Sequence, residues 1–95
     1  MKFVALIHGN DAERMKWPEA QQKTELEGYF AYDALLTRER ALVCGEALVA
    51  KHVKGGQLLG LYLLDVPSRQ HALELAAKCP GATTGAIEVR AAVPV

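Results

Sequence analysis

The stretch Leu58-Leu59-Gly60-Leu61-Tyr62-Leu63-Leu64-Asp65-Val66 decides the fold. It is apolar at nearly every position and has the length of a β-strand, which predicts a central strand of a sheet. A strand of this composition is buried on both of its faces. We therefore expect helices to cover one face of the sheet and a partner chain to cover the other.

Three further strands and two helices are predicted around this central strand. Pro18 suits the first turn of a long helix over about 18–39, and Ser68 is a candidate N-cap for a second helix over about 69–78. Gly45-Glu46 is predicted to end the second strand. The other predicted strands are 3–8, 41–44 and 85–92, with 48–53 as an edge or bent continuation of the second and a turn at 54–56.

The predicted order of elements, βαββαβ, is typical of the α+β ferredoxin-like fold, a four-stranded antiparallel sheet with both helices on one face. The chain has 95 residues, which is the size of a single domain, and 51% of them are hydrophobic. This apolar excess suggests that the second face of the sheet packs against a second copy of the chain. The expected assembly is a homodimer, a dimeric α+β barrel with a cavity for a small molecule.

Charge and cysteine content exclude several classes of function. Eleven basic and eleven acidic residues balance, and like charges are not clustered, so neither nucleic acid nor a membrane surface is an expected partner. The apolar run at residues 3–7 is too short for a membrane span or a signal peptide, which predicts a cytoplasmic protein. Cys44 and Cys79 lie far apart and outside any metal-binding spacing, so no metal and no cofactor are expected.

Four blocks of sequence, in this order along the chain, resemble the YCII-related or DGPF-domain family. The resemblance covers nearly the whole chain and implies a dimeric α+β barrel with distant similarity to muconolactone isomerase-like and dehydrochlorinase-like enzymes. The blocks are FVALIHG (3–9), ALVCGEAL (41–48), GLYLLDV (60–66) and CPGA to IEVR (79–90).

The chain departs from the family pattern at two places. The Asp-Gly-Pro-Phe segment that names the family should fall between Val53 and Leu58, where only Lys54-Gly55-Gly56-Gln57 is found, so a pocket-edging loop looks deleted. Members closest to YCII itself resemble enzymes that use a His on the long helix and an Asp just after the second helix. The matching positions here are Gly28 and Cys79, so the dyad is absent in that form.

Two titratable residues are candidates for acid/base catalysis. On a helical wheel Asp33 lies near the centre of an apolar stripe formed by Leu26, Tyr29, Phe30 and Leu36. A carboxylate in apolar surroundings can act as a general acid or base near neutral pH. The alternative is that Asp33 only accepts a hydrogen bond from a tyrosine or pairs with an arginine.

His8 ends the first strand, next to the predicted positions of Glu88 or Arg90 on the last strand and of Tyr62 on the third. A histidine, a tyrosine and a carboxylate in one cleft would suit proton transfer on a small carbonyl or lactone substrate. The alternative is that His8 is a polar residue at which the strand stops.

Two functions from different classes remain open. The first is a small-molecule enzyme of isomerase or lyase type that moves a proton without a cofactor, and the second is a non-catalytic regulatory or accessory module. For the enzyme, His8 and Asp33 are the predicted catalytic residues. The predicted substrate-binding residues are Tyr29, Tyr62, Glu46 and Arg90.

Overall fold

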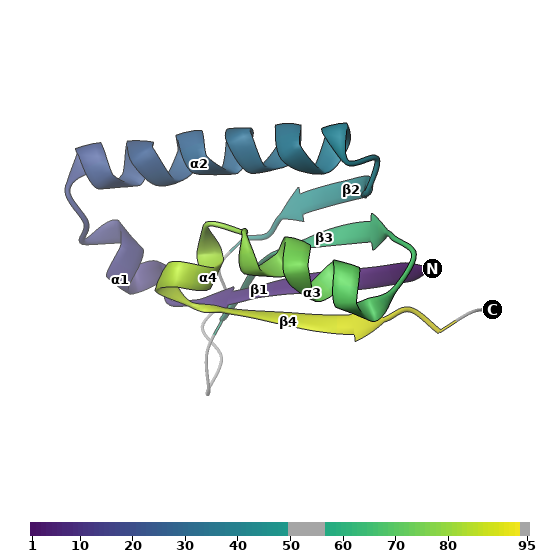
Figure 1. The fold of residues 1–95 in the computed structure, drawn as a ribbon. Coiled ribbons are helices and arrows are strands. Elements are labelled where there is room, and N and C mark those ends of the chain that lie inside the picture. Colours follow the sequence, from purple (N-terminus) through teal and green to yellow (C-terminus); the bar gives the residue numbers. More distant parts are fainter. Residues whose placement is uncertain (50–56, 94–95) are drawn as a thin grey trace.

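The computed structural model describes residues 1–49 and 57–93 and confirms the predicted βαββαβ order, with two short helices added (Figure 1). The expected turn at 54–56 and most of the region between Val53 and Leu58, where the DGPF segment was expected, lie outside the described residues. The strands are β1 (Lys2–Gly9), β2 (Leu42–Ala47), β3 (Gln57–Asp65) and β4 (Ala86–Ala91). The helices are α1 (Asp11–Met15), α2 (Glu19–Arg38), α3 (Arg69–Ala77) and α4 (Gly81–Thr84).

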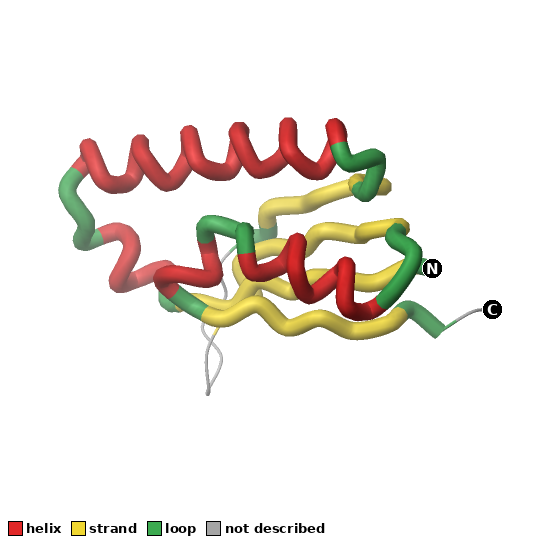
Figure 2. The backbone as a smooth tube through the Cα atoms, viewed as in Figure 1, coloured by secondary structure: helices red, strands yellow, loops and turns green. Residues whose placement is uncertain are grey.

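The four strands form one antiparallel sheet in the order β2-β3-β1-β4, so the apolar strand β3 and the first strand β1 are the central pair. This order confirms the prediction that the first strand lies between the third and the last. The helices lie on one side of the sheet in both ribbon views (Figures 1 and 2). None of the helices in the described part of the chain is both long and apolar enough to cross a membrane.

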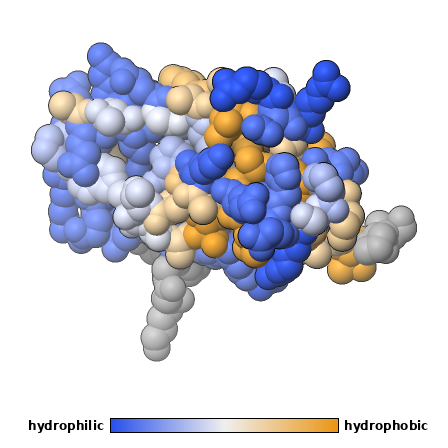
Figure 3. All heavy atoms as spheres, in the orientation of Figure 1, coloured by the Kyte–Doolittle hydropathy of each residue, from blue (hydrophilic) through white to orange (hydrophobic). Residues whose placement is uncertain are grey.

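The core lies between the sheet and the two longer helices. Directly paired residues of an antiparallel sheet point to the same face, and the pair Phe3 and Leu64 is buried completely on the helix side. Leu36 of α2 packs with them, and the Tyr32 hydroxyl donates a hydrogen bond of 2.8 Å to the Leu75 carbonyl. Figure 3 shows the resulting band of hydrophobic side chains between α2 and α3, bordered by hydrophilic ones.

The buried face of α2 differs from the predicted stripe. Leu36 is buried as expected, but the other buried residue is Tyr32, while Leu26 and Phe30 are 55% and 63% exposed. The reason is that the middle of α2, residues 25–33, borders a cavity, so the position of a residue on the helical wheel does not decide its burial there.

Gly45 does not end the second strand, as its sequence suggested. The strand continues to Ala47 after a register shift between Leu42 and Cys44, and Gly45 pairs with Tyr62 of β3. A Cβ atom at Gly45 would lie 2.8 Å from the ring carbons of Tyr62, closer than such atoms approach. Glycine is therefore needed because a tyrosine ring lies against the backbone.

The other side of the sheet carries an apolar surface with no helix on it. The register places Val4 opposite Leu63 and Leu6 opposite Leu61, on the side away from Phe3 and Leu64. These four residues are partly exposed, and we call the surface that they form the open face. Its composition agrees with the apolar excess of the sequence.

Candidate functional site

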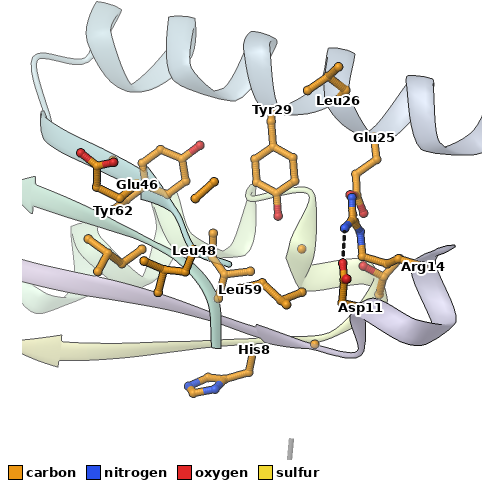
Figure 4. A pocket seen from close by; sticks show the side chains of 18 of the residues that line it. His8, Asp11, Arg14, Glu25, Leu26, Tyr29, Glu46, Leu48, Leu59 and Tyr62 are labelled. Carbon is orange, nitrogen blue, oxygen red and sulfur yellow. Dashed lines mark hydrogen bonds and ion pairs between the residues drawn. The ribbon is translucent and has the colours of Figure 1, made fainter. Parts of the chain in front are cut away.

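A cavity of about 670 Å³ lies between the middle of α2 and one end of the sheet (Figure 4). Its walls come from the end of β1, from α1, α2, β2 and β3, and from the first and last residues of α4. This volume falls within the range of pockets that hold small organic molecules. The lining side chains used below are Asp11, Glu13, Arg14, Trp17, Glu25, Tyr29, Phe30, Asp33, Glu46 and Tyr62.

Asp33 and Tyr62 form a hydrogen-bonded pair on the wall of the cavity. The Tyr62 hydroxyl donates to Oδ1 of Asp33 at 2.6 Å, a short distance typical of a hydroxyl bound to a carboxylate. The ring of Tyr62 is held edge-on by Tyr32, with 5.3 Å between the ring centroids. Burial, and secondly the contact with Asp33, raises the pKa of Tyr62 above its ordinary value, so its proton stays in place at neutral pH.

Tyr29 stands between the two ends of the cavity, pointing from α2 toward the sheet (Figure 4). A Cβ atom at position 81 would lie 2.7 Å from its hydroxyl, so the absence of a side chain at Gly81 leaves room for the Tyr29 ring. Burial raises the pKa of Tyr29, which keeps its hydroxyl protonated and able to donate a hydrogen bond. The Cys79 thiol is 4.0 Å from the same oxygen.

A charged cluster closes the α1 end of the cavity, and the sequence reasoning missed it. Arg14 of α1 donates from Nε to Glu25 of α2 at 2.7 Å and from Nη1 to Asp11 at 3.0 Å. Its Nη2 also contacts Glu25, and the hydrogen bond to Glu25 raises the pKa of Arg14. The signal for this helix was the Asn10 to Glu13 spacing, since the Asn10 side chain caps α1 by accepting from the Glu13 amide.

His8 and Arg90 lie away from this constellation. His8 is at the edge of the cavity lining, but its imidazole points away from Tyr29 and lies beyond the β1 ribbon (Figure 4). Its Nε2 is 3.1 Å from Glu88, which confirms that β4 brings a carboxylate to it. Arg90 does not line the cavity; its Nε donates to Glu88 at 2.7 Å, and this bond lowers the pKa of Glu88.

The structure therefore separates the predicted site residues into two groups. Asp33, Tyr29, Tyr62 and Glu46 line one cavity together with His8 at its edge, whereas Arg90 does not line it. His8, Tyr62 and carboxylates therefore border the same cavity, but the His8 imidazole bonds to Glu88 and points away from Tyr29. The physical reason is the pleat of β1, which directs Ile7 toward the helices and the next residue toward the open face.

Gly28 and Cys79, the positions that the resemblance matches to a His/Asp dyad, are not among the described residues that line the cavity. Gly28 is on α2, where an added Cβ atom would approach Pro80 to 3.4 Å. Cys79 is buried, and burial raises the pKa of its thiol, which agrees with a packing role. Within 1–49 and 57–93, no three histidine, cysteine or acidic side chains are grouped as metal ligands.

The sheet, its helical cover and the cavity define a ferredoxin-like protein of the dimeric α+β barrel class of folds. The model of the YCII-related domain matches residues 1–95, and the chain belongs to this family. No curated protein sequence gives a significant match.

Among solved structures, the chain is similar to 5-chloro-2-hydroxyhydroquinone dehydrochlorinase (TftG) from Burkholderia phenoliruptrix AC1100, in complex with 2,5-dihydroxybenzoquinone. The two share 14% identity and a TM-score of 0.62, over 98% of this chain and 94% of that one. At this identity the similarity supports the fold alone.

Proposed function

We propose that the protein binds a small organic molecule in the cavity between α2 and the sheet and catalyses a proton transfer on it without a cofactor. The observation that carries the proposal is the Tyr62 and Asp33 pair, whose carboxylate borders a cavity of ligand size. Asp33 Oδ2 makes no hydrogen bond within the described residues, so it is available to a ligand. The structural relative holds a six-membered ring compound, which supports a ligand of similar size.

Asp33 is the general acid/base in this proposal, and Tyr62 is its positioning residue. The carboxylate takes a proton from a carbon beside a carbonyl group and returns it to another carbon of the same molecule, as an isomerase does. The hydrogen bond from Tyr62 fixes the rotation of the carboxylate, and the protonated Tyr29 hydroxyl donates to the carbonyl oxygen of the ligand. Glu46 binds the ligand from the edge strand β2. His8 and Arg90 are assigned to the open face.

The test is a search for proton exchange. Small cyclic ketones and lactones are incubated with the protein in D₂O, and loss of the proton next to the carbonyl is followed by NMR. We expect the Asp33→Asn variant to bind the same compounds but to lose exchange by a factor of about 10² or more, the range of general acid/base catalysis. The matched control is Glu27→Gln, on the solvent side of the same helix. Exchange at the wild-type rate in Asp33→Asn refutes the role of Asp33.

A non-catalytic binding module is the second candidate function. It is favoured by Gly28 and Cys79, which stand at the positions where the members closest to YCII itself resemble enzymes with a histidine and an aspartate. If the protein is such a module, both the wild type and Asp33→Asn bind ligands in the cavity, and neither exchanges a ligand proton. The same experiment therefore separates the two candidates.

We also propose that the open face joins two copies of the chain into a homodimer. Four apolar side chains on a sheet surface that no helix covers favour packing against an identical surface. Light scattering at micromolar concentration should give the mass of a dimer, and Leu61→Arg should give a monomer. Leu73→Arg, an exposed leucine on α3, is the control that should leave the mass unchanged. A monomeric wild type refutes this assembly.

A further inference from the structure

The side chains around the cavity are strongly unbalanced in charge. Among the lining residues in 1–49 and 57–93, five are carboxylates and one is a guanidinium, and Lys16, outside the lining, pairs with Glu13 at 3.5 Å. The carboxylates come from three elements, α1, α2 and β2. They are Asp11, Glu13, Glu25, Asp33 and Glu46.

Arg14, the one arginine or lysine among the described lining residues, is already paired. Glu25 takes its Nε and Nη2 donors, and Asp11 takes Nη1 at 3.0 Å. The Glu25 side chain is only 10% exposed, so pulling Arg14 away would leave a poorly solvated carboxylate behind. An anionic ligand therefore finds no free guanidinium to pair with, and the Arg14 cluster itself keeps a net negative charge.

The opposite end of the cavity offers hydrogen-bond acceptors. Asp33 uses one oxygen for the Tyr62 hydroxyl, and Glu46 of the edge strand β2 also lines the cavity. The ring of Tyr29 stands between Tyr62 and Glu25 (Figure 4), and Phe30, which is 63% exposed, adds aromatic surface to the lining. Acceptors at one end and aromatic surface beside them are the complement of a cation with an apolar body.

We infer that the cavity takes an organic cation, a protonated primary or secondary amine attached to an aromatic or other apolar body. The inference rests on the proposed function and narrows its ligand class. The ammonium group donates to Glu46, its apolar body packs against Tyr29 and Phe30, and Asp33 adds negative charge while keeping its second oxygen for the proton transfer. Carboxylates in a cavity with low-dielectric walls attract a cation and repel an anion of the same shape. The cavity therefore selects for the cation and against the anion.

The experiment compares three probes of nearly equal shape: 2-phenylethylamine, 2-phenylethanol and phenylacetate. Each is titrated to millimolar concentration at pH 7 while amide chemical shifts of the full chain are recorded. Shifts at Gly45 and Gly60, whose backbones line the cavity, report binding there. We expect the amine to bind about tenfold more tightly than the alcohol, and phenylacetate to bind least.

Charge-neutralising variants identify the source of the selectivity. Glu46→Gln, at an exposed position, and Asp33→Asn should each reduce the preference for the amine over the alcohol severalfold. Glu27→Gln, on α2 but outside the cavity, should leave it unchanged. Phenylacetate or the alcohol binding as tightly as the amine overturns the cation assignment and leaves the cavity as the site. No shift at Gly45 or Gly60 with any probe overturns the proposed binding function as well.

Discussion

The pairing of Tyr62 with Asp33 can be measured with a double-mutant cycle of Tyr62→Phe and Asp33→Ala. Phenylalanine keeps the ring and its edge contact with Tyr32, so only the hydroxyl and its 2.6 Å hydrogen bond are lost. Hydrogen bonds to charged groups contribute about 1.5–3 kcal/mol to stability when buried. Asp33 borders the cavity and is partly exposed, so water can replace the hydroxyl and the expected loss for Tyr62→Phe is about 1 kcal/mol.

The assay is urea denaturation at 25 °C and pH 7, followed by circular dichroism and by the fluorescence of the single tryptophan, Trp17. In a thermal unfolding experiment, the same loss of about 1 kcal/mol lowers the midpoint by roughly 4–8 °C in a domain of this size. All variants are measured at one protein concentration, because dimerisation would add to the apparent stability.

The coupling energy decides the outcome. If the two side chains interact as the structure shows, the double variant loses about 1 kcal/mol less stability than the sum of the losses in the two single variants. Tyr32→Phe is the control, since the hydroxyl of Tyr32 bonds to the Leu75 carbonyl and not to Asp33. Effects of Tyr62→Phe and Asp33→Ala that add to within about 0.3 kcal/mol would refute the pairing.

Three further predictions concern the backbone, the cavity and the tyrosines. Arg40 follows α2 with a positive φ of 57°, so Arg40→Gly should raise the free energy of unfolding by about 1 kcal/mol. Ala34→Gly, at an exposed position in the interior of α2, should lower it by about as much, and equal effects of the two variants in urea denaturation contradict this. Gly81→Ala places a methyl group 2.7 Å from the Tyr29 hydroxyl and should cost about 1–3 kcal/mol and weaken ligand binding, and an unchanged stability and affinity would show that the contact is loose. Folding raises the pKa values of all three tyrosines, so above about pH 10 the folded chain keeps protons that the unfolded chain loses. The stabilisation that is present below pH 10 should therefore fall as the pH rises further. Absorbance at 295 nm should then rise only together with unfolding, and a rise centred at pH 10 in a chain with native circular dichroism speaks against buried tyrosines.

The architecture could be predicted from the sequence because it depends on local patterns. The apolar run at 58–66 and the helix starts near Pro18 and Ser68 are each set by a few neighbouring residues, and the six predicted elements occur in the predicted order. Two elements were missed for the same reason. Helices α1 and α4 are one turn long, and their hydrophobic pattern is too short to be read.

The site could be predicted only in part. Asp33 and Tyr62 were singled out separately, and their hydrogen bond spans 29 positions of the chain. The Arg14 and Glu25 contact was not predicted, because it depends on how α1 turns back onto α2. His8 was placed correctly beside β4, but a strand-end residue can face either side of a sheet, and one step along the strand reverses the side.

The sequence by itself determined the fold class, the family and the central position of β3, because hydrophobic periodicity and turn residues are written in neighbouring positions. Only the tertiary structure decided which titratable groups share a cavity. Contacts between distant residues depend on sheet register, on the pleat of β1 and on how far α2 stands from the sheet, and these follow from the packing of the whole domain.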